Sequence, residues 1–179
     1  MGQLGRMVVV ALAGLGAACD PDNLDLDNDD DVTFDVTLTP AQVVPVCPAA
    51  GADAAGSGDF TVSEDDTSIT ITNFTFSGLS GPVTVGHIHF GVAGMVGPVV
   101  LAFVPVAVPF DLTFTAADYP IAPSGAPADF AALGLAARTG QTYVDLHTEA
   151  CPDGEIRGQI EGPAVRDDRA PRRAVSAAR

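Results

Sequence analysis

The three histidines of this 179-residue chain all lie in two short segments. His87 and His89 alternate with apolar residues in the first segment, and His147 follows Tyr143 and Asp145 at two-residue spacing in the second. Side chains two residues apart on a β-strand project from the same face, so each segment is expected to present its polar residues together. Imidazoles gathered in this way either bind a metal ion or belong to a buried polar network.

A third polar segment follows closely, in which Glu155, Arg157 and Gln159 share one face of a predicted strand. If residues 148–154 form a hairpin turn, His147 lies near Glu155 and Asp145 lies near Arg157. In a network without metal, those two contacts would satisfy the buried polar groups and hold the sheet together, and His147→Ala would lower stability only. The residues predicted to form the polar network are Tyr143, Asp145, Arg157 and Gln159.

A metal site is the other interpretation of the same pattern. A strand carrying the first two histidines beside the hairpin would bring three imidazoles and one carboxylate into one patch. Neutral imidazoles with a carboxylate suit zinc or copper, and distances of about 2.0–2.2 Å are expected for zinc. The predicted ligands are His87, His89, His147 and Glu155. Both interpretations stay open at this point.

Other catalytic patterns are missing from the sequence. It contains no nucleophile elbow, no phosphate-binding loop and no dinucleotide fingerprint. Catalysis by those routes has no support, and no catalytic residue is assigned.

The elements that must position these residues are mostly strands. Two-residue alternation broken by Gly and Pro predicts strands at 33–39, 59–63, 68–76, 82–90, 98–104, 111–115, 142–148 and 155–161. Within 68–76 the apolar residues change parity, which predicts a bulge near Asn73. A short helix is expected over 128–138, where Pro127 suits the first turn and Gly140 the end. The expected fold is all-β, an antiparallel β-sandwich or partly closed barrel of about eight strands.

The N-terminus has the pattern of an export signal. An apolar run over 7–18 follows Arg6 and is too short to span a bilayer, so residues 1–18 are predicted to be a signal peptide. Leu15-Gly16-Ala17-Ala18-Cys19 resembles a bacterial lipoprotein signal, although the leucine stands four residues before the cysteine instead of three. We therefore expect lipidation at Cys19 and anchoring in the bacterial cell envelope, with a secreted soluble product as the alternative.

Cysteine number supports this assignment. Three cysteines are odd for an exported protein unless one of them is modified. Lipidation of Cys19 leaves Cys47 and Cys151 as a predicted disulfide, which would close a loop of about 100 residues and stabilise the fold by roughly 4 to 5 kcal/mol. Two free thiols are the alternative.

Charge defines the ends of the domain. Aspartates crowd residues 19–31, which predicts an acidic tether, and arginines among Ala and Pro over 164–179 predict a disordered tail. The domain predicted between them, 32–163, has Arg138 and Arg157 as its only basic residues. With a net charge of −15 for the whole chain and no basic face, nucleic acid is not expected as a partner.

Several motifs occur in an order that resembles the CHRD domain family, first described in chordin. They are Leu38 to Pro45, Gly56 to Phe60, Gly78 to Val83, His87-Ile88-His89, Gly94 to Pro98, Tyr143 to Thr148 and Gly154 to Gln159. The chain departs from the usual pattern at Phe90 and at the two cysteines of the predicted disulfide. The resemblance implies a β-rich extracellular module without a defined common activity. The leading expectation is a lipid-anchored envelope module that binds an extracellular protein or glycan, and the rival is a zinc or copper metalloprotein.

Overall fold

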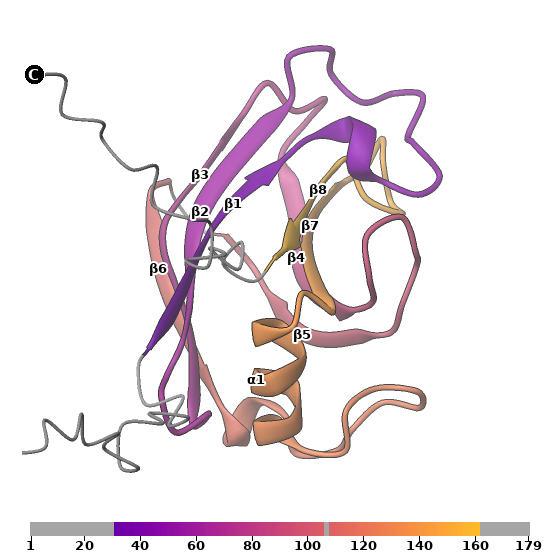
Figure 1. Cartoon of the computed structure of the whole chain (residues 1–179). Helices are drawn as coiled ribbons and strands as arrows, with labels where there is room; N and C mark the ends of the chain where they lie inside the picture. The colour runs from indigo at the N-terminus through magenta and orange to yellow at the C-terminus, as the bar shows by residue number, and fades with distance from the viewer. Residues whose placement is uncertain (1–30, 106–107, 162–179) are drawn as a thin grey trace, which may run out of the picture.

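The computed structural model describes residues 31–105 and 108–161. The predicted signal peptide (1–18), the lipidation site Cys19, nearly all of the predicted tether (19–31) and the predicted tail (164–179) lie outside these residues. Eight strands, one α-helix and two short 3-10 helices make up the described part (Figure 1). They are β1 Val32–Leu38, η1 Pro40–Gln42, β2 Ala55–Val62, β3 Ser68–Ser77, β4 Val83–Phe90, β5 Val99–Phe103, β6 Phe110–Thr115, η2 Ala116–Asp118, α1 Phe130–Arg138, β7 Thr142–Thr148 and β8 Ile156–Ile160.

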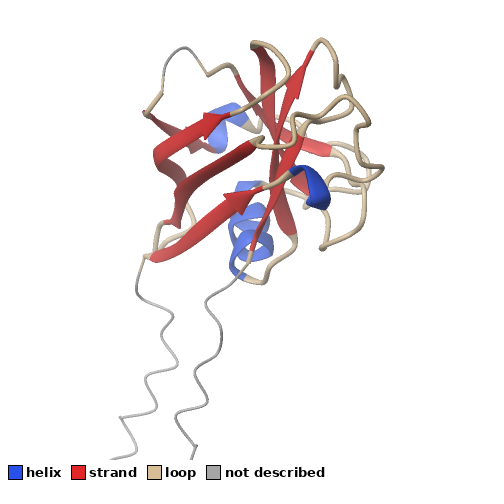
Figure 2. Cartoon of the chain, turned by 90° about the horizontal axis from the view of Figure 1, so that it is seen from above, coloured by secondary structure: helices blue, strands red, loops and turns tan. Residues whose placement is uncertain are grey.

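The strands form two four-stranded antiparallel sheets, in the orders β1-β2-β3-β6 and β5-β4-β7-β8. The sheets face each other (Figure 2), which confirms the predicted all-β fold as a sandwich and not a closed barrel among the described strands. They approach at one edge, where Thr39 and Arg157 exchange two backbone hydrogen bonds of 2.9 and 3.1 Å. Within the described ranges no helix has the length and apolar character needed to cross a membrane.

Alternation explains how each sheet buries one face. In β1 the apolar residues Phe34, Val36 and Leu38 are buried while the residues between them are exposed or partly exposed. The same parity in the other strands builds one core between the sheets, to which Phe60, Ile71, Phe74, Ile88, Val144, Leu146 and Ile156 contribute. The free energy of this burial is the main term that holds the two sheets together.

The predicted irregularities are present at or near their predicted positions. The β3–β6 register shifts between Ile71 and Phe74, and Asn73 has a φ of 54°, which confirms the bulge. The helix begins two residues later than predicted, because the Asp129 side chain accepts a hydrogen bond of 2.8 Å from the Ala132 amide and acts as its N-cap. Its buried residues include Phe130, Leu133 and Ala137, the predicted apolar face, and α1 lies at one end of the two sheets (Figure 1).

A candidate metal centre on the outer face of one sheet

The outer face of the β5-β4-β7-β8 sheet carries the histidines on its two central strands. The β4–β7 register places His87 opposite Asp145 and His89 opposite Tyr143, with His147 two residues farther along β7, opposite Val85. All seven residues of β7 are buried, because loops cover this face of the sheet while the core covers the other. The polar face of the strand is thus enclosed, which is why its side chains must find partners within the protein.

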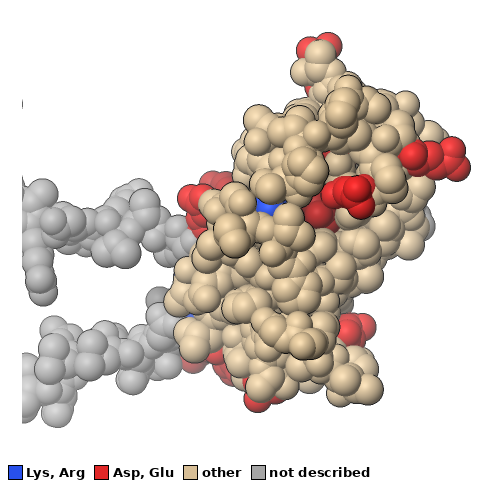
Figure 3. Space-filling view, turned by 90° about the vertical axis from the view of Figure 1, so that its right-hand side faces the viewer, with Lys and Arg blue, Asp and Glu red and all other residues tan. Residues whose placement is uncertain are grey.

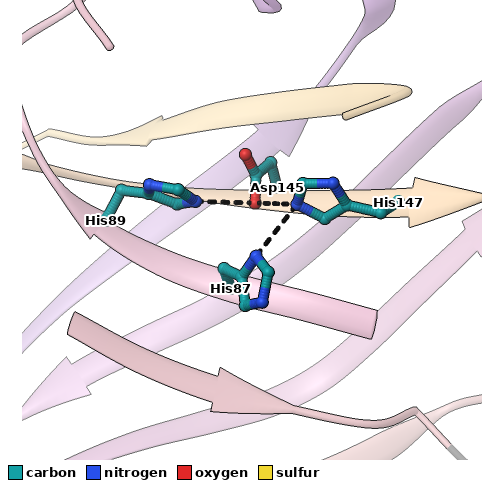
Figure 4. A group of neighbouring side chains, drawn as sticks. All are labelled: His87, His89, Asp145 and His147. Atoms are coloured by element: carbon teal, nitrogen blue, oxygen red, sulfur yellow. Dashed lines mark hydrogen bonds and ion pairs between the residues drawn. The ribbon is translucent and has the colours of Figure 1, made fainter. Parts of the chain in front are cut away.

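Four side chains converge there, namely His87, His89, Asp145 and His147, which we call the His–Asp cluster (Figure 4). One donor atom from each lies within 4.8 Å of the others. His147 Nε2 is 3.0 Å from His87 Nδ1 and 3.0 Å from Asp145 Oδ1, and His89 Nε2 is 3.3 Å from the same Oδ1. Donors about 2.0–2.1 Å from a common ion lie about 3.0–3.4 Å apart, so these three separations match those around one transition-metal ion. The widest spacing among the four donor atoms, up to 4.8 Å, must shorten when an ion binds.

Two backbone carbonyls fix the orientation of the imidazoles. The Gly97 carbonyl lies 2.9 Å from His89 Nδ1, and the Pro152 carbonyl lies 2.8 Å from His147 Nδ1. A carbonyl oxygen accepts hydrogen bonds only, so each Nδ1 carries the proton and, in the neutral ring, each Nε2 presents a lone pair to the cluster. Metal-bound histidines are usually oriented by such contacts to the second ring nitrogen.

The resulting arrangement needs a positive charge at its centre. His89 Nε2 is buried without a hydrogen-bond partner and meets the Asp145 carboxylate, which in its ionised form also has only lone pairs to offer. Lone pairs that face each other in a buried site repel unless a proton or a metal ion lies between them. The geometry therefore leaves two chemical solutions, protonated imidazoles or a bound cation.

The pKa shifts of three cluster residues follow from burial and from the charges of their neighbours in the cluster. Burial would raise the pKa of Asp145, but its interactions with the neighbouring His147 and His89 rings outweigh burial and lower that pKa. Burial would lower the pKa of His147, but its bond to Asp145 prevails and raises it. The pKa of His87 is lowered by burial and then by the neighbouring His147 charge. The Asp145 carboxylate thus stays ionised at neutral pH, and His87 stays a neutral imidazole that can act as a metal ligand.

Of the four predicted network residues, Asp145 belongs to the cluster, whereas Tyr143, Arg157 and Gln159 lie beside it and bond to the loop over 91–98. Arg157 lies 3.4 Å above the centre of the Tyr143 ring, whose other face stacks on His89 at 4.6 Å and 7°. The Arg157 guanidinium donates to the Met95 carbonyl at 2.8 Å and the Val92 carbonyl at 3.1 Å instead of bonding its register partner Asp145. Gln159 donates to three further carbonyls, those of Gly91, Gly140 and Thr142.

Glu155 does not join the cluster, and Asp145 supplies the carboxylate in its place. The regular β7–β8 ladder ends at the pair Leu146–Ile156, and Gly154 has a φ of 113°, so strand parity does not extend to Glu155. Its carboxylate instead accepts from the Ser80 hydroxyl and amide, both at 2.6 Å, the Thr148 hydroxyl at 2.6 Å and the Gly51 amide at 3.2 Å. Burial would raise its pKa, but these donors outweigh burial and lower the pKa of this fully buried group.

The predicted disulfide between Cys47 and Cys151 is present, with Cα atoms 5.8 Å apart. It ties the loop after η1 to the loop between β7 and β8. Cys151 directly precedes Pro152, whose carbonyl orients His147. The crosslink thus fixes a segment that contacts the His–Asp cluster.

A cavity of about 350 Å³ lies over the cluster and is lined in part by all four of its side chains. Figure 3 views this side of the molecule and shows a hollow with acidic side chains in and beside it. The remaining lining residues are mostly apolar, namely Val43, Val44, Pro45, Val96, Val99, Tyr143, Pro152, Asp153 and Arg157. The cluster is therefore enclosed on the sheet side and open on the cavity side.

The sandwich, its crosslinked loops and the cluster on one outer face together define an all-β module with a candidate metal centre. The family model for the CHRD domain matches residues 34–160, which include the cluster and both cysteines. The chain belongs to this family, as its motifs predicted. No match was found among curated proteins or among solved structures.

Sequence reasoning missed two parts of the site, Asp145 as the cluster's carboxylate and the Gly97 and Pro152 carbonyls. The parity of Asp145 with His147 was visible in the sequence, but only the β4–β7 register places it opposite His87. Backbone carbonyls in loops leave no signal in residue types.

Proposed function

We propose that this chain is an exported cell-envelope module that binds one zinc or copper ion through His87, His89, His147 and Asp145. The single observation that carries the proposal is the pair of carbonyls at His89 Nδ1 and His147 Nδ1. They direct two lone pairs toward a buried carboxylate, an arrangement that a cation satisfies. Imidazole and carboxylate donors suit zinc and copper in particular.

The test is elemental analysis of the full chain, purified from its native envelope without a metal-affinity tag. Wild-type protein is expected to hold close to one zinc or copper ion per chain, and His87→Ala and His147→Ala are expected to lose it. A wild-type protein that remains free of metal after exposure to both ions, with variants that are only less stable, would reject the metal site.

A second candidate function is a binding module whose cluster is purely structural. It is favoured by His147 Nε2, which lies 3.0 Å from two acceptor atoms and could hold both through one shared proton. In that case the partner is an envelope or extracellular protein or glycan, and the metal analysis above gives the negative result.

Export and anchoring belong to the same proposal. The disulfide supports an oxidising compartment, because such crosslinks rarely persist in the cytosol. Lipidation at Cys19 would then attach the domain to the membrane. Mass spectrometry of the mature N-terminus checks this, and an unmodified Cys19 in the membrane fraction would contradict it.

A further inference from the structure

We infer that the metal ion keeps one coordination position open to the cavity, where it takes a small ligand with one donor atom and an apolar body. This inference rests on the proposed metal site and adds to it a ligand class. A closed structural site would have no such position, so the inference separates two kinds of metal centre.

The first argument comes from where the donors lie. All four belong to β4 and β7, adjacent strands of one sheet, so they approach the ion from the sheet side. The Gly97 and Pro152 carbonyls bind the far nitrogens of two rings and leave the cavity side of the ion free. Among the four, His87 is partly exposed and the other three are buried, and all four side chains line the cavity.

The second argument comes from the cavity walls. A volume of about 350 Å³ falls in the range of small-molecule sites, which are mostly apolar with few polar groups. Here the polar groups are the cluster itself with Tyr143, Asp153 and Arg157 at its margin, and the walls are Val43, Val44, Pro45, Val96 and Val99. A ligand that fits such a cavity binds the metal through one atom and packs an apolar group against valines.

The test uses copper-loaded protein, in which the visible and electron paramagnetic resonance spectra report on coordination. Azide probes the open position, and imidazole and 4-phenylimidazole probe the walls. Azide is expected to change both spectra. 4-Phenylimidazole is expected to bind about tenfold or more tightly than imidazole, because burial of its phenyl ring adds hydrophobic free energy.

A matched pair of variants locates the ligand. Val99 pairs with His89 in the β4–β5 register and lines the cavity, whereas Val104 is exposed outside it. Val99→Phe is expected to retain one copper and to weaken 4-phenylimidazole binding at least about tenfold by filling the space. Val104→Phe is expected to behave as wild type.

The possible results distinguish a failure of this inference from a failure of the proposed metal site. One copper per chain with spectra that no probe alters would overturn the open position and leave the metal site in place. Equal affinities for imidazole and 4-phenylimidazole, or equal effects of the two phenylalanines, would overturn the apolar ligand class. A chain that binds no copper would overturn the metal site and this inference together.

Discussion

At the residue scale, Asp145 is the group whose replacement reports most directly on the cluster. As a ligand it supplies the only negative charge among the four donors. Asp145→Asn is expected to weaken zinc binding by more than about 100-fold, since loss of a mere outer-shell partner of a ligand costs about 10- to 100-fold. Competition with a chromophoric chelator measures this, and Asp35→Asn, on an exposed face of the other sheet, should leave the affinity unchanged. Equal affinities in all three proteins would exclude Asp145 as a ligand.

Glu155 gives the second prediction at this scale, and it concerns stability. Its carboxylate accepts four hydrogen bonds in a fully buried position. Glu155→Gln replaces one carboxylate oxygen by an NH2 group, which would face groups that also donate hydrogen bonds. We expect the free energy of unfolding to fall by about 1.5–3 kcal/mol at neutral pH, the range for a hydrogen bond to a charged group.

The pH dependence of that loss has a defined sign. The folded pKa of Glu155 lies below its ordinary value of 4.5, so the unfolded chain takes up the proton first as pH falls. The stabilisation is therefore complete above the ordinary value and disappears as pH decreases through the folded pKa. Chemical denaturation at a series of pH values should show wild type and Glu155→Gln converging in acid. A difference that stays constant would show that the carboxylate charge is not the cause.

At the element scale, the loop over 91–98 depends on a single guanidinium for two of its contacts. Arg157 reaches the Val92 and Met95 carbonyls with separate nitrogens, which lysine cannot reproduce. Arg157→Lys is expected to raise amide hydrogen exchange across 91–98 by about tenfold, as each lost hydrogen bond contributes roughly 1 kcal/mol. Arg138→Lys, at the end of α1, serves as the control. Unchanged exchange in Arg157→Lys would mean that other contacts hold the loop.

Gly97 gives a second prediction for the same loop. A Cβ at this position would collide with the Phe90 carbonyl, so Gly97→Ala must displace the backbone whose carbonyl orients His89. Zinc affinity is expected to fall about 10- to 100-fold, the cost of losing a partner of a metal ligand. Gly81→Ala meets no atom within 4 Å and should bind zinc as wild type does. Isothermal titration of both variants checks this, and a normal affinity in Gly97→Ala would show that the carbonyl is dispensable.

The face of a strand on which each side chain lies was predictable from the sequence wherever side chains alternate at two-residue spacing. Alternation placed His87 with His89 and Asp145 with His147, and the change of parity located the bulge at Asn73. Parity fails at Glu155, because the positive φ of Gly154 ends the ladder before that residue. A two-residue rule holds only while the backbone stays extended, and turn geometry was not readable from composition.

At the scale of the whole molecule, the sandwich followed from strand count and one-sided burial, whereas the strand order did not. The order β5-β4-β7-β8 pairs β4 with β7 across more than fifty residues, and no local pattern specifies such a partner. The disulfide was the exception among long-range contacts, since the expected lipidation of Cys19 left Cys47 and Cys151 as the pair among three cysteines. The disulfide is therefore expected to affect both the stability of the whole fold and the geometry of the His–Asp cluster.

The last prediction tests that link. The disulfide spans 104 residues, so the double variant Cys47→Ser, Cys151→Ser is expected to lose roughly 4 to 5 kcal/mol of unfolding free energy in the chain-entropy model. Because Cys151 precedes the Pro152 carbonyl that orients His147, zinc affinity should also fall, by about tenfold or more. Denaturation and zinc titration of the same samples measure both. If stability falls but zinc affinity does not, the segment around Pro152 keeps its position without the crosslink, and the disulfide stabilises the fold alone.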